Sequence, residues 1–242
     1  MSKDIDTRIT PSLHPLRIKE LDGYDDETAL VLGQTEEAFT TAYEGLKSIW
    51  DAKDAAMRDP RLNEAGALLK TDAYADTVFN KITRTFDTEL ARLTKAINHL
   101  EGELTQPVES KAVSSMSAEI RAHVKGLPTS ERMSLIRRAI EDGDTLTASS
   151  VLGGPSYLSG LDAEMAKTFI RMFHEKQNPK LAQRHRAMSA ARKLIEEHAG
   201  KCFAERDKAV GYITDPKTKR KLYPAELRKM AEAADKPFAR AS

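Results

Sequence analysis

Residues 72–104 read DAYADTVFNKITRTFDTELARLTKAINHLEGEL, the strongest helical pattern in the chain. Apolar residues recur three and four positions apart, which predicts one long helix with a single apolar face. From Leu90 onward the spacing follows a heptad pattern, and such a stripe has to be covered by another helix. A neighbouring helix of the same chain and a second copy are both candidates. The stripe comprises Val78, Ile82, Phe86, Leu90, Leu93, Ile97, Leu100 and Leu104.

A second helix is expected just before this one. Thr35 is a suitable N-cap, and the two glutamates after it suit the first turn of a helix. Pro60 ends the pattern. The two helices together predict an antiparallel helical hairpin over residues 34–104, preceded by an extended N-terminal arm over residues 1–33. The expected buried face of the first helix comprises Phe39, Ala42, Tyr43, Leu46, Ile49, Trp50 and Met57.

The rest of the chain predicts a linker, a region of several helices and a basic C-terminal segment. Residues 105–114, TQPVESKAVS, form a linker. Residues 115–210 then form a multi-helix region, whose long last helix begins near Asn178. Residues 211–242 form a basic C-terminal segment with an Asp-Pro turn. The fold class is therefore expected to be all-α: a long helical hairpin plus a multi-helix bundle, with room for a small β-hairpin near the C-terminus.

The sequence argues against most enzyme classes. It contains no glycine-rich phosphate loop and no HExxH or GxSxG motif. The single cysteine, Cys202, excludes a disulfide within the chain and a Cys-rich zinc site. Cys202 and His198 fall on the apolar side of the last long helix and are expected in the core. We therefore expect no catalytic residue, no cofactor, no metal site and no small-molecule substrate.

Residues 149–161 read SSVLGGPSYLSGL and allow two interpretations. Two glycines and a proline stop one helix before the next begins, so the stretch can be only a helix connection. Alternatively, Tyr157, Leu158 and Leu161 form an exposed apolar knob that a partner binds. Leu93, Ile97 and Leu100 of the heptad stripe are a second candidate surface for a partner.

Charge is distributed unevenly along the chain. Residues 1–37 carry four basic and nine acidic residues, whereas residues 211–242 carry eight basic and four acidic residues. Oppositely charged ends are typical of head-to-tail contact or of a basic tail on an acidic partner. Two ends that simply face solvent are another interpretation, and contact of the basic segment with nucleic acid is a further one. The candidate residues for this contact are Lys217, Lys219, Arg220, Lys221 and Arg228.

Residues 117–200 also resemble a known group of proteins. The helix with ERMSLIRRAIEDGD, the stretch VLGGPSYLSGL and the following DAEMAKTF together resemble uncharacterised helical proteins encoded in tailed-phage genomes near virion genes. The resemblance implies a phage-encoded protein with a structural or accessory role, and it implies no catalytic residue.

These features predict a non-enzymatic phage virion or assembly-associated protein that acts through helix packing and an extended arm. Its partners would be itself, another virion protein or both. No apolar run reaches the ~18–20 residues of a membrane helix, so no membrane partner is expected. The expected location is the host cytoplasm, with incorporation into the virion. The alternatives are a nucleic-acid-associated accessory protein and a phage effector that binds a host protein.

Overall fold

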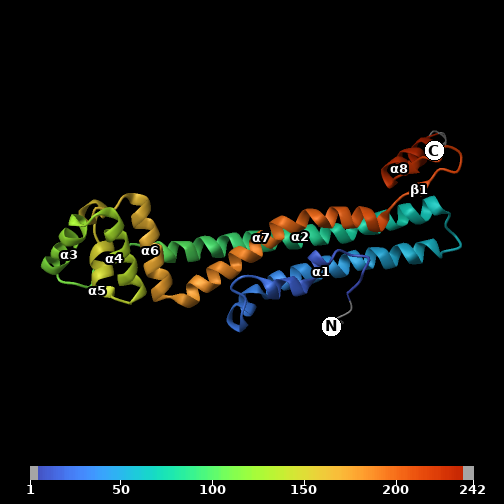
Figure 1. Ribbon diagram of the computed structural model, residues 1–242. Helices are drawn as coiled ribbons and strands as arrows, with labels where there is room; N and C mark the ends of the chain where they lie inside the picture. Colours follow the sequence, from blue (N-terminus) through green and yellow to red (C-terminus); the bar gives the residue numbers. More distant parts are fainter. Residues whose placement is uncertain (1–4, 237–242) are drawn as a thin grey trace. The chain divides into compact units, whose positions relative to one another are not determined.

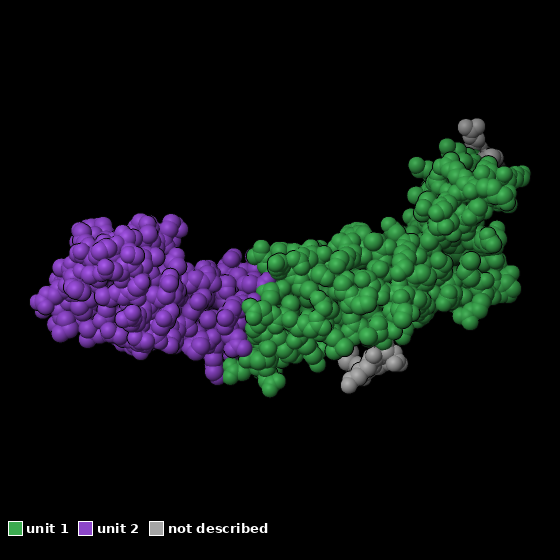
Figure 2. Space-filling model, viewed as in Figure 1, with its two compact units in different colours: residues 1–93, 190–242 green, residues 94–189 purple. Residues whose placement is uncertain are grey.

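The computed structural model describes residues 5–236. Residues 1–4 of the expected arm and residues 237–242 of the expected basic segment lie outside the described residues. The predicted all-α fold is confirmed, with long helices that pack together and a small antiparallel β-hairpin near the C-terminus (Figure 1). The chain divides into two compact units (Figure 2). Unit 1 comprises residues 1–93 and 190–242, and unit 2 comprises residues 94–189.

Two long helices contribute residues to both units: α2 (Glu64–Leu104) and α7 (Pro179–Val210). The remaining elements of unit 1 are the 3-10 helices η1 (Pro11–Leu13) and η2 (Pro15–Glu20), α1 (Asp26–Met57), β1 (Ile213–Thr214), β2 (Lys221–Leu222) and α8 (Pro224–Asp235). The remaining elements of unit 2 are α3 (Ser114–Gly126), α4 (Thr129–Glu141), α5 (Thr145–Leu152), the 3-10 helix η3 (Ser156–Ser159) and α6 (Ala163–Gln177).

Within unit 1, α1 and α2 form an antiparallel hairpin. The rings of Phe39 and Phe86 pack edge to face, with their centroids 5.3 Å apart. Further along, the Tyr74 hydroxyl donates to Ser48 at 3.2 Å. Phe39 thus pairs with Phe86 and Ser48 with Tyr74, so the two helices run in opposite directions. A Cβ atom on Gly45 would lie 2.9 Å from the Val78 side chain, which shows how closely the helices approach. The apolar stripe of α2 is therefore covered by α1 between Val78 and Phe86.

The first long helix begins at Asp26, not near Thr35 as the sequence predicts. The cap is a reciprocal pair: the Asp25 carboxylate accepts from the amide of Thr28, and the Thr28 hydroxyl accepts from the amide of Asp25, each at 2.7 Å. Thr35 is instead a buried mid-helix residue whose hydroxyl donates to Glu89. A threonine followed by two glutamates imitates an N-cap, but the true cap lies further upstream.

The expected extended arm is also partly folded. Pro11 and Pro15 each start a 3-10 helix, because proline already has the backbone angle of a first helical residue. Ile9, Leu13 and Ile18 of this segment are buried, although Leu16 is exposed, and η1 and η2 both pack against α1. Tyr43 of α1 accepts a hydrogen bond from the Asp6 amide at 2.6 Å, which fixes the start of the segment.

Charged side chains join three helices of unit 1. Asp72 and Asp76 of α2 both form ion pairs with Arg206 of α7 and with Arg228 of α8. Only 5% of the Asp72 side chain is exposed, so its charge depends on these two guanidinium groups rather than on water. Phe79 of α2 also packs against α7, through the ring of Phe203.

In unit 2, a second cluster surrounds His185 of α7. Arg171 of α6 donates to Glu101 of α2 at 2.7 and 2.8 Å and to Glu175 at 2.9 Å. A third nitrogen of Arg171 lies 3.4 Å from Nδ1 of His185. A guanidinium can only donate, so Nδ1 accepts and the imidazole is neutral. Its Nε2–H then donates to Glu101 at 3.0 Å.

The apolar centre of unit 2 lies among α3, α4, α5 and α6. Ile136 of α4, Val151 of α5 and Phe169 of α6 are each at most 1% exposed. The short helices are amphipathic, so each buries one face here and leaves the other to solvent. In the part of the chain that the structure describes, no helix combines the length and apolar character needed to cross a membrane.

Replacing Asp72 should destabilise the fold. Asp72→Ala removes the buried carboxylate that Arg206 and Arg228 share and leaves Asp76 as the one acidic partner common to both, so we expect a loss of about 2–4 kcal/mol in the free energy of unfolding. The matched control is Asp207→Ala, which removes an exposed partner of the same Arg206 and should cost under about 0.5 kcal/mol. Urea denaturation measures both, and equal losses would contradict the prediction.

Acid should weaken the fold through His185. Burial, followed by the charge of Arg171, lowers the pKa of His185, although Glu101 and Glu175 oppose this. The unfolded chain therefore takes up the proton first, and the free energy of unfolding falls as the pH drops through about 6.5. His185→Gln should reduce this loss between pH 7.5 and 5.

The control for this measurement is His99→Gln, because His99 is highly exposed. Urea denaturation at the two pH values gives the loss for each variant. The prediction is wrong if His185→Gln and His99→Gln show the same loss as the unmodified chain.

Candidate functional site

The connector between α5 and α6, residues 153–161, is fixed at its start by close backbone packing. A Cβ atom on Gly153 would lie 2.6 Å from the carbonyl oxygen of Ser149 and 2.7 Å from the amide nitrogen of Ser110. Both neighbours are backbone atoms, so only glycine fits. At the other end Gly160 has a φ of +70°, a left-handed conformation that also favours glycine.

Arg132, in the first turn of α4, holds the end of the connector. Its guanidinium donates to the carbonyl oxygen of Gly160. It also donates to the carbonyls of Val124, Lys125 and Leu127, at 3.2, 3.0 and 2.8 Å. These three carbonyls lie at the C-terminus of α3, where a helix leaves its acceptors unpaired and carries negative partial charge. One arginine therefore caps α3 and anchors the connector.

Two further hydrogen bonds have acceptors in α5, just before the connector. Arg121 of α3 donates to the carbonyl of Ser150 at 2.9 Å. The buried hydroxyl of Ser159 donates to the carbonyl of Val151, also at 2.9 Å. Side chains from two other helices thus hold the backbone on both sides of the turn, which restricts its freedom before any partner binds.

This fixed turn exposes two of the three residues proposed as a knob. Tyr157 is 66% exposed and Leu158 is 39% exposed. Leu161 is buried and anchors the connector to the core of unit 2. Close packing explains Leu161 and Gly153, and the left-handed backbone explains Gly160, as the interpretation of a helix connection requires. It does not explain an exposed tyrosine and leucine side by side on a rigid turn.

The heptad candidates lie elsewhere and are largely covered. Leu93 and Ile97 are buried, and Leu100 is half-buried. A partner would reach the first two only after the helices had moved apart. The structure does not bring these three residues together with the 153–161 turn into one surface.

Two of the five candidate nucleic-acid residues already have acidic partners. Arg228 forms ion pairs with Asp72 and Asp76, and Arg220 forms one with Glu226. Neutralised guanidinium groups contribute little to the attraction of a phosphate backbone. The pairing of Arg228 joins residues more than 150 positions apart, so the local sequence gave no sign of it.

The other three candidates lie on the β-hairpin. The ammonium group of Lys221 lies 4.3 Å from the ring centroid of Tyr212, a cation–π contact. Lys217 and Lys219 lie exposed in the turn, and within residues 5–236 neither forms an ion pair. Lys219 has a φ of +58°, which is unusual for a residue with a side chain. The free positive charge of this segment is therefore smaller than its sequence indicates.

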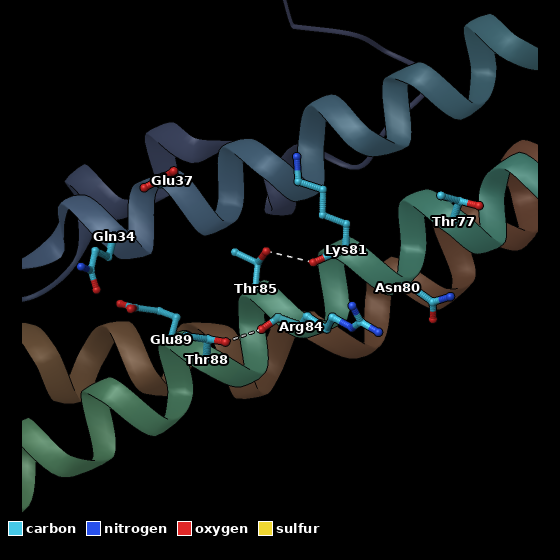
Figure 3. Close-up of a pocket in the computed structure, with 9 residues that line it drawn as sticks. All are labelled: Gln34, Glu37, Thr77, Asn80, Lys81, Arg84, Thr85, Thr88 and Glu89. Atoms are coloured by element: carbon cyan, nitrogen blue, oxygen red, sulfur yellow. Dashed lines mark hydrogen bonds between the residues drawn. The ribbon is translucent and has the colours of Figure 1, made fainter.

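A polar groove lies between α1 and α2 in unit 1 (Figure 3). Its volume is about 700 Å³. Lys81 and Arg84 contribute exposed cations, but the hydroxyls of Thr85 and Thr88 donate to carbonyls one turn back, at 2.9 and 2.8 Å. These hydroxyls present only lone pairs to the groove, so they do not add donors for an anion. The groove offers no arrangement of acid, base and nucleophile.

Cys202 and His198, the two titratable residues expected in the core, both have pKa values shifted by burial. Burial raises the pKa of Cys202 to about 12, so its thiol stays protonated and unreactive. Burial lowers the pKa of His198, which favours a neutral ring. Among residues 5–236, no group of three or more histidine, cysteine or acidic side chains could hold a metal ion.

Sequence reasoning missed Arg121 and Arg132, which shape the candidate site. Arg132 lies in the stretch ERMSLIRRAIEDGD, but the resemblance assigns it no role. Both arginines act through backbone carbonyls, which a sequence pattern does not reveal. Arg132 and Gly160 are 28 positions apart. The position of Arg132 just after the Gly126 helix stop was the one local signal, because basic side chains often cap the end of a preceding helix.

Alanine at Gly153 should destabilise unit 2. The added Cβ would overlap backbone atoms of two segments, so we expect Gly153→Ala to cost about 1–3 kcal/mol or more of the free energy of unfolding. Gly154→Ala is the matched control, because its Cβ would meet only the flexible Arg121 side chain, at 3.4 Å. Thermal denaturation of both variants tests this, and similar stabilities would show that the connector is not tightly packed.

Comparison with models of protein families, with curated proteins and with solved structures gives no match.

Proposed function

We propose that this chain is a non-enzymatic, protein-binding component of a phage particle or of its assembly, and that it presents Tyr157 and Leu158 to another virion protein. The observation that carries the proposal is the exposure of these two side chains on the rigid 153–161 turn. The phage setting comes from the resemblance of residues 117–200, and the location would be the host cytoplasm and the virion.

A rigid turn with an exposed tyrosine suits protein binding for energetic reasons. Tyrosine supplies a large contact area and a hydroxyl at a low cost in side-chain entropy. A segment already held by Arg121, Arg132 and Ser159 loses little further freedom on binding. Residues with these properties are typical of the few that dominate the affinity of an interface.

Two alternatives use other parts of the chain or another partner. A phage effector would present the same turn to a host protein. A nucleic-acid-associated accessory protein would rely on Lys217, Lys219 and Lys221, since Arg220 and Arg228 already have acidic partners. Self-association through the heptad stripe is less favoured, because Leu93 and Ile97 are buried.

The double variant Tyr157→Ala/Leu158→Ala should lose its association with phage particles. If both side chains are central to the interface, affinity for the partner falls by about 30-fold or more. The experiment measures co-sedimentation of the tagged chain with particles from phage-producing cells. Leu30→Ala, which truncates an 86% exposed leucine of α1, is the control and should sediment like the unmodified chain.

Both variants alter exposed side chains, so thermal denaturation should show them folded. Equal co-sedimentation of the double variant and the unmodified chain would contradict the proposal. Loss of the association after nuclease treatment would favour the nucleic-acid alternative. Binding to a host protein in uninfected cells, abolished by the double variant, would favour the effector.

A further inference from the structure

A groove with an apolar floor crosses the surface of unit 2 between α3 and α4 and reaches the start of α5. Its volume is about 780 Å³. Val124 and Ala139 lie buried at its base, while Ile120, Leu127 and Leu135 are half-buried along it. The apolar side chains of two neighbouring helices therefore remain partly uncovered by the chain.

The rim of this groove is acidic. Glu119 of α3, Glu131 of α4 and Asp142 after α4 line it and are exposed. In the part of the chain that the structure describes, none of these three carboxylates forms an ion pair. Asp144 adds a fourth carboxylate, although it also caps α5 by accepting from the amide of Thr147.

Positive charge in the groove does not balance these carboxylates. Arg138 is the one lysine or arginine among the lining residues, and it stands against the four carboxylates of Glu119, Glu131, Asp142 and Asp144. The groove therefore combines an apolar centre with a negative edge, which is complementary to a segment with an apolar stripe flanked by basic residues.

The shape of the groove favours a helix as the occupant. The walls are two consecutive helices joined by a short corner, and a third helix can pack its ridge of side chains into the space between them. A strand that pairs with a sheet would need an unpaired sheet edge, and no strand is among the elements that line the groove.

We propose that the α3–α4 groove binds an amphipathic basic helix of a partner protein, with apolar side chains on Ile120, Leu127 and Leu135 and lysine or arginine side chains against Glu119, Glu131 and Asp142. This surface shares no residue with the Tyr157–Leu158 turn. It is therefore a second binding site and does not depend on the function proposed above.

A designed peptide tests this site directly. The probe is a fluorescently labelled helix of about 18 residues, roughly five turns, with leucines along one face and lysines on both sides of them. Fluorescence anisotropy with the full-length chain should show saturable binding. A control peptide with glutamate in place of every lysine should bind at least about tenfold more weakly, a difference of about 1.4 kcal/mol.

Variants of the chain separate the groove from general charge attraction. Glu131→Lys and Leu135→Ala should each weaken binding of the lysine peptide by about tenfold. Glu141→Lys is the matched control, because it makes the same charge change on an exposed residue of α4 outside the groove lining. This control should change the affinity by less than about twofold.

Three outcomes would overturn the proposal: no binding of the lysine peptide, equal binding of the two peptides, or equal weakening by Glu131→Lys and Glu141→Lys. The variant Tyr157→Ala/Leu158→Ala should bind the peptide as the unmodified chain does. If it does not, the groove is not a separate site.

Discussion

A 41-residue helix with an apolar stripe along its length is stable only if other segments cover that stripe, and this requirement on α2 organises unit 1. Phe39 of α1 covers Phe86, and Phe203 of α7 covers Phe79 with ring centroids 4.6 Å apart. Ion pairs from Asp72 and Asp76 then fix α7 and α8 along the polar side of α2. The apolar spacing along α2 predicted that other segments would cover it, whereas the identity of these segments depended on contacts distant in the sequence.

The sequence located the bodies of the helices, because periodic apolar residues and proline or glycine stops are local signals, although α2 begins at Glu64 and not at Asp72. It placed the start of α1 wrongly, because a threonine followed by two glutamates imitates a cap, while the real cap combines Asp25 with Thr28. It also overstated the free charge of the C-terminal segment. The pairing of Arg228 with Asp72 spans most of the chain, and nothing in the local pattern of either residue indicates the other.

The candidate site was found from the sequence in part only. Its exposed residues, Tyr157 and Leu158, stand out because an aromatic and an aliphatic side chain follow a glycine-glycine-proline stop. The rigidity that makes them suitable for binding comes from Arg121 and Arg132, whose acceptors are backbone carbonyls. Backbone acceptors carry no residue identity, so sequence patterns cannot reveal such contacts. The acidic groove was missed for a related reason, since its residues come from three helices and form a surface only after folding.

The long-range contacts of unit 1 have a consequence for the order in which the chain folds during synthesis. The Lys208 ammonium donates to the carbonyl of Arg8, 200 positions earlier, and Arg206 neutralises the almost fully buried Asp72. When the first two long helices leave the ribosome, the faces that α7 will cover are still exposed to water. Unit 2, whose residues are contiguous in the chain, closes its contacts over far shorter loops. Unit 2 can therefore be complete in the nascent chain before the part of α7 that belongs to unit 1 has been synthesised. During that interval the uncovered apolar face of α2 is the part of the chain most prone to aggregation.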